Sequence, residues 1–75
     1  MSVICVSSLK KNIGKTTIIS GIAQESINRR KKTFVGEISD GKIIHHESFY
    51  SISQIDINKV DLNKSEIVLV ELNNL

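Results

Sequence analysis

The chain has 75 residues, a net charge of +2 and a hydrophobic fraction of 40%, with only 4% aromatic residues. A chain this short forms one domain at most and buries only about 60% of its unfolded surface. The small net charge does not indicate a nucleic-acid binder driven by overall charge. No apolar run approaches the roughly 20 residues of a membrane span, so we expect a soluble, cytoplasmic protein. The small size of the chain predicts marginal stability.

The first apolar segment, Val3 to Val6, is short and continuous, which predicts a strand covered on both faces. Cys5 lies within it and is expected to be a buried thiol in a reducing compartment. No spacing of Cys and His in the chain resembles a zinc site. The polar and basic stretch from Ser7 to Gly14 predicts a loop.

A helical pattern begins at Thr16. Apolar residues then recur on one stripe, at Ile18, Ile19, Ile22, Ala23 and Ile27. The basic run from Arg29 to Lys32 closes the segment, where positive charge complements the carboxyl end of the helix dipole. We interpret this run as a solvated helix end and not as a nucleic-acid patch.

The second half of the chain contains two further strand signals, at Thr33 to Ile38 and at Ile67 to Val70. Ser39-Asp40-Gly41 predicts a turn after the first of them. Residues 42–56 are apolar in part but have no clean period, and residues 56–66 are polar and turn-rich. Glu71 stands at the end of the last strand.

This order of elements predicts an α/β fold with a right-handed parallel βαβ unit. Ligands of such sheets bind beyond the carboxyl ends of the strands. We therefore expect three polar groups on one rim, namely the segment Ser7 to Thr17, the segment Glu37 to Asp40, and Glu71.

The sequence Gly14-Lys15-Thr16-Thr17 has the composition of a phosphate-binding loop. A phosphate cradle needs inward-facing backbone N–H groups and a helix amino terminus behind them, and glycine permits close approach of the phosphate. Lys15 can reach the β- and γ-phosphates and Thr16 can place its hydroxyl on Mg²⁺, while Thr17 can contact an α-phosphate. The alternative is a helix start that contains Gly-Lys-Thr by chance.

Residues 10–17, Lys-Lys-Asn-Ile-Gly-Lys-Thr-Thr, resemble the variant phosphate loop of the MinD/ParA ATPases, K-G-G-x-G-K-T-T. The resemblance implies a partial P-loop NTPase (Rossmann-like) parallel sheet of about three strands with one main helix after the loop. It also implies ATP and Mg²⁺ as cofactors. The related dethiobiotin-synthetase and cobyrinate amidotransferase ligases share this architecture.

The same resemblance assigns roles to individual residues. Lys10 corresponds to the signature lysine that reaches across a dimer interface and is the catalytic candidate. The nucleotide phosphates would be held by Asn12, Ile13, Gly14, Lys15, Thr16 and Thr17, and Mg²⁺ by Thr16 and Glu71. Lys11 and Asn12 replace two family glycines, Glu71 replaces the Walker B aspartate, and Glu37 or, more loosely, Asp40 aligns with the aspartate after the second strand.

We therefore interpret residues 1–75 as an amino-terminal piece of a P-loop nucleotide-binding domain in a MinD/ParA-like ATPase. Its sheet would be completed by the remainder of a longer chain, or its site by a homodimer through the nucleotide face. One alternative is an ATP-dependent ligase that forms a phosphorylated carboxylate. Another is a non-enzymatic α/β binding module.

Two further patterns give weaker hypotheses. Residues 58–61, Asn-Lys-Val-Asp, resemble the guanine-specificity motif N-K-x-D of GTPases, but they precede Glu71, whereas the motif follows the Walker B element in that family. His45 and His46 are adjacent, so in a strand they would point to opposite faces and would not share a metal. A solvated turn or the edge of a switch-like segment is the interpretation that we favour for the two histidines.

Overall fold

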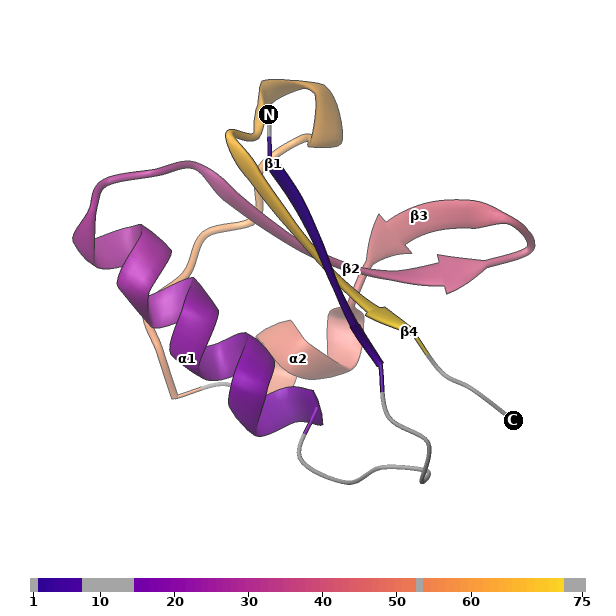
Figure 1. Cartoon of the computed structure of the whole chain (residues 1–75), viewed down its shortest axis with the longest axis horizontal. Coiled ribbons are helices and arrows are strands. Elements are labelled where there is room, and N and C mark those ends of the chain that lie inside the picture. Colours follow the sequence, from indigo (N-terminus) through magenta and orange to yellow (C-terminus); the bar gives the residue numbers. More distant parts are fainter. Residues whose placement is uncertain (1, 8–14, 53, 73–75) are drawn as a thin grey trace.

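Four strands form a single mixed sheet in the order β1-β4-β2-β3 (Figure 1). The computed structural model describes residues 2–7, 15–52 and 54–72. β4 (Ile67–Leu72) lies between β1 (Ser2–Ser7) and β2 (Thr33–Ser39) and is parallel to both. β3 (Lys42–His45) is antiparallel to β2. The α/β class is confirmed, and the three predicted strands β1, β2 and β4 are parallel to one another. β3 is a fourth, antiparallel strand that makes the sheet mixed.

The antiparallel strand arises from a tight hairpin. Asp40 and Gly41 have φ angles of 51° and 75°, and Ser39 pairs with Lys42 across them. Asp-Gly with two positive φ angles is the sequence that two-residue hairpin turns favour. The predicted turn is confirmed, but β3 was not predicted because four residues are too few to show a period.

The helix α1 (Lys15–Asn28) packs on one face of the sheet. Ile19 and Ala23 are fully buried against Val35 and Leu69. Ile18, which the apolar stripe placed in the core, is 51% exposed. Part of the predicted stripe therefore lies beside the core and not in it.

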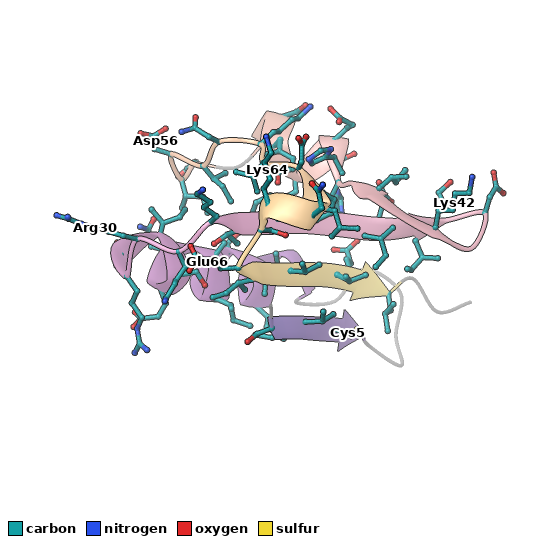
Figure 2. The ribbon with its side chains drawn as sticks, turned by 90° about the horizontal axis from the view of Figure 1, so that it is seen from above. Cys5, Arg30, Lys42, Asp56, Lys64 and Glu66 are labelled. Carbon is teal, nitrogen blue, oxygen red and sulfur yellow. The ribbon has the colours of Figure 1, made fainter. Side chains whose placement is uncertain are left out.

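The basic run after α1 lies in the connection to β2 and not in the last helical turn. Arg30 has a φ of 59°, and the N–H of Lys31 donates to the carbonyl of Ser26 at 3.0 Å. A left-handed residue with this backbone bond is a common helix termination. Figure 2 shows Arg30 and Lys42 at opposite ends of the molecule.

A second short helix, α2 (Glu47–Ile52), contributes to the same core as α1. Phe49 of α2 is 1% exposed and belongs to the cluster of Ile19, Ala23, Val35 and Leu69. The segment from 54 to 66, which includes the 3₁₀ helix η1 (Leu62–Lys64), then crosses to the other face. There Val60 and Leu62 pack on Phe34, Val68 and Val70.

β1 is an exposed strand at the edge of the described sheet. Residues 2–5 are all exposed, with Val3 at 56% and Ile4 at 37%. Within the described residues β1 pairs only with β4. The expectations of a strand covered on both faces and of a buried Cys5 are therefore wrong, because Cys5 is an exposed thiol on this edge (Figure 2). Neither helix in the described part of the chain has the length and apolar character needed to cross a membrane.

Candidate functional site

The parallel strands β1, β4 and β2 end along the same side of the sheet, which we call its carboxyl edge. The strand register aligns Val6 of β1 with Glu71 of β4, and Glu71 with Glu37 of β2. Neighbouring strands lie about 4.8 Å apart, so Glu71 stands beside the point at which the chain leaves β1 at Ser7. The predicted rim therefore brings Glu71 and Glu37 together, on the sheet face that α1 covers.

Most of the predicted phosphate loop lies outside the described residues. This applies to Lys10, Asn12, Ile13 and Gly14. Lys15 and Thr16 begin the backbone of α1, with side chains that are also outside the description. Thr17 lies in the first turn of α1 and is exposed. In the chain, the end of β1 therefore directly precedes residues 8–14, and the start of α1 directly follows them.

Asp40, the second candidate for the position after strand two, lies in the hairpin turn and is exposed. Glu37 is half-buried and is in register with Glu71. Of the two acidic candidates, Glu37 is therefore the one that the sheet places beside Glu71.

Glu71 is the most buried acidic side chain of this edge, with 9% of the residue exposed. Its Oε2 lies 3.1 Å from Nε2 of His46, and the two side chains are 11% and 12% exposed. Buried polar groups are retained where they find partners, and this pair meets that requirement. His46 is the site residue that sequence reasoning missed.

The two adjacent histidines face different partners. The Nε2 of His45 lies 2.9 Å from the carbonyl of Val60, and its ring stacks on Phe34 with centroids 4.4 Å apart. His46 instead contacts Glu71 and Phe49. The prediction that the two would point to opposite faces assumed a strand, but His46 lies just after β3; the hydrogen bonds of the two rings nevertheless go to different residues. The interpretation of both as a solvated turn is wrong, because both rings are half-buried and hydrogen-bonded.

α2 is held against β2 beyond the end of β3. The N–H of His46 donates to the carbonyl of Val35 at 2.9 Å, and the N–H of Val35 donates to the hydroxyl of Tyr50 at 3.0 Å. The pairing of β2 with β3 ends at Gly36. The backbone carbonyl of Val35 is therefore hydrogen-bonded by His46, and its N–H by Tyr50 of α2. Burial raises the pKa of Tyr50, and the Val35 N–H opposes that rise.

An ion pair on the surface connects α2 to the following segment. The Nζ of Lys59 lies 2.8 and 2.6 Å from the two carboxylate oxygens of Glu47, and it lies 5.6 Å from the ring centre of Tyr50. The hydrogen bond from Lys59 lowers the pKa of Glu47. In the described structure the lysine of the Asn58-Lys59-Val60-Asp61 pattern is therefore engaged with α2.

The opposite end of the sheet carries the basic run. An open pocket of about 230 Å³ is lined there by residues that include Arg30, Lys31, Lys32, Asp56 and Asn58. Lys31 pairs with Glu66 at 3.6 Å. The N–H of Lys32 donates to Glu66 at 3.2 Å, and this bond is the main cause of the lowered pKa of Glu66. Arg30, Asp56 and Glu66 lie at the end of the molecule away from the carboxyl ends of β1 and β4 (Figure 2).

The described residues include no group of three or more His, Cys, Asp or Glu side chains arranged to hold a metal ion. Comparison with family models, with curated proteins and with solved structures finds no match for the chain.

Proposed function

We propose that the chain binds the phosphates of ATP with Mg²⁺ at the carboxyl edge of its sheet, as part of a MinD/ParA-like ATPase. The observation that carries the proposal is the arrangement β1, residues 8–14, α1, with Glu71 in register beside the end of β1. A strand that passes through a short polar loop into a helix is the context that a phosphate loop requires.

The proposed roles follow from the chemistry of each group. The amides of residues 12–16 and the ammonium of Lys15 would hold the phosphate oxygens. Thr16 and Glu71 would hold Mg²⁺, which would neutralise phosphate charge. Oxygen ligands suit this ion, and Glu71 fits such a role because it is a buried carboxylate near the end of β4, in register with Val6 of β1.

Catalysis would be in-line attack of water on the γ-phosphate. Lys10 is the residue proposed to stabilise the charge that develops in the transition state. By the stated resemblance it would act across a dimer interface, so hydrolysis would depend on protein concentration. Release of inorganic phosphate by the wild type and by Lys10→Ala, measured across a concentration series, tests this role. Equal rates in the two proteins would refute it.

Nucleotide binding is tested by calorimetric titration of ATP with Mg²⁺ into the wild type and Lys15→Ala. A charged hydrogen bond contributes about 1.5–3 kcal/mol, so we expect Lys15→Ala to lose at least about tenfold in affinity. Lys64→Ala is the matched control, because Lys64 lies in η1, is 71% exposed and pairs only weakly with Asp61 at 3.9 Å. Equal affinity in Lys15→Ala and Lys64→Ala would refute the phosphate-loop assignment.

A second candidate is a non-enzymatic α/β binding module. The observation that favours it is that Glu71 already has a protein partner, His46, and that β1 exposes an apolar edge. A module of this kind would show no saturable ATP binding in the same titration.

A further inference from the structure

His46 connects three elements of the fold through its backbone and its ring. It follows β3 directly and precedes α2 directly. Its N–H donates to the carbonyl of Val35 in β2 at 2.9 Å, and its carbonyl accepts from the N–H of Tyr50 at 3.2 Å. The position of the imidazole is therefore set by backbone bonds to both β2 and α2.

The hydrogen bonds of the ring define its tautomer. Nδ1 lies 3.1 Å from the N–H of Phe49 and accepts from it. A neutral imidazole that accepts at Nδ1 carries its proton on Nε2. The Nε2–H then donates to Oε2 of Glu71, 3.1 Å away.

This arrangement fixes the orientation of the Glu71 carboxylate. A glutamate side chain loses up to about 1.5–2 kcal/mol of rotamer freedom when it is ordered. In this protein His46 imposes that order before any ligand arrives, in a site where both side chains are nearly buried. Among the described residues, the hydrogen bond of His46 is to Oε2, and Oε1 is the oxygen that would ligate a cation. Partners that orient a metal ligand in this way strengthen metal binding.

We propose that His46 is a positioning residue, which holds Glu71 in the orientation that binds Mg²⁺ with the nucleotide phosphates. This inference rests on the proposed ATP function. It adds a residue that lies 25 positions before Glu71 in the sequence and that contacts neither the nucleotide nor the metal. It also makes α2 a structural support of the site, because the same ring accepts from the first turn of that helix.

Two substitutions separate the contact to Glu71 from the contact to α2. His46→Asn keeps an oxygen near the Nδ1 position, and Asn is a favoured residue before a helix, but its side chain has no donor near the Nε2 position. His46→Gln keeps an N–H donor near the Nε2 position. The helical signal and unfolding midpoint of each variant are measured by circular dichroism.

The decisive quantity is the affinity for ATP measured with Mg²⁺ divided by the affinity measured with EDTA. We expect His46→Asn to lower this ratio about fivefold or more, which is the fold-change that about 1 kcal/mol of lost order produces. Its EDTA affinity should equal that of the wild type. We expect His46→Gln to retain most of the ratio, and Lys15→Ala to lose affinity in both conditions.

The outcomes distinguish the two proposals. A wild type that binds ATP in neither condition refutes the proposed function and the role of His46 with it. A wild-type ratio in His46→Asn, together with the expected loss in Lys15→Ala, refutes only the positioning role. Equal loss of ratio in both His46 variants, accompanied by loss of helical signal, would assign His46 to folding alone and would also overturn that role.

Discussion

Replacement of Tyr50 by Phe tests how α2 is attached to the sheet. The substitution keeps the ring that packs on the core and removes the hydroxyl that accepts from Val35 at 3.0 Å. Val35 is fully buried, so its N–H would be left without that partner. An unsatisfied buried donor costs about 1–3 kcal/mol, which is a large part of the roughly 4–11 kcal/mol expected for a domain of this size.

We expect Tyr50→Phe to lower the free energy of unfolding by about 1–3 kcal/mol, and the midpoint temperature by about 4–8 °C for each kcal/mol. The assay is urea and thermal unfolding followed by far-UV circular dichroism. Ser48→Ala, on the exposed side of the same helix, should change stability by no more than about 0.5 kcal/mol. A Tyr50→Phe variant as stable as Ser48→Ala would refute the proposed anchoring of α2 through Val35.

The same substitution predicts a difference at high pH. Burial raises the pKa of Tyr50 above its ordinary value of 10.0. A group with a raised pKa in the folded state contributes stability that is present below about pH 10 and is lost as the pH rises through the folded-state pKa. The stability advantage of the wild type over Tyr50→Phe should therefore shrink above pH 10. An advantage that stays constant to pH 11.5 would contradict this assignment.

Three other expectations follow from the packing. A Cβ at Gly36 would lie 2.6 Å from the Phe34 ring and 2.8 Å from the backbone oxygen of Ile44, so Gly36→Ala should lower the free energy of unfolding by about 1–3 kcal/mol. Gly21 lies in open space within α1, so Gly21→Ala should raise it by about 0.5–1 kcal/mol. Chemical unfolding of both variants tests these expectations. Val3→Lys on the exposed strand β1 should reduce concentration-dependent self-association of the chain in sedimentation experiments, without lowering its stability. Unchanged self-association would show that β1 is not the strand through which chains associate. Cys5 should react with a thiol reagent in the native protein nearly as fast as in urea, and strong protection would contradict its exposure.

The parts of the fold that could be predicted from the sequence depend on local patterns. The strands around Val35 and Leu69 and the helix from Lys15 have enough consecutive residues to show their period. β3 and α2, with four and six residues, do not. The exposure of Cys5 was missed for a different reason, because an apolar run does not reveal whether its strand is central or at an edge.

Of the two contacting residues at the candidate site, Glu71 was predicted from the sequence and His46 was not. Glu71 was predicted because it stands at the end of a strong strand signal, and its position next to the end of β1 follows from the order of the strands. His46 reaches Glu71 through the register of an antiparallel hairpin and a helix that begins at residue 47. The turn at Asp40-Gly41 has a local sequence signal, but the four residues of β3 and the six of α2 do not. The partner of a predicted site residue therefore came only from the structure.

The contacts of His46 also explain why the short helix α2 belongs with the site and not only with the core. A six-residue helix is too short to be stable in isolation, so α2 depends on what holds its ends. Its beginning depends on the Nδ1 of His46, and its first turn is tied to β2 through Tyr50. The Nε2 of the same ring lies 3.1 Å from Oε2 of Glu71, so one imidazole contacts both the start of α2 and the carboxylate at the end of β4. A substitution of His46 therefore removes a contact from α2 and a contact from Glu71 at the same time, which is why the Asn and Gln variants are needed to separate them.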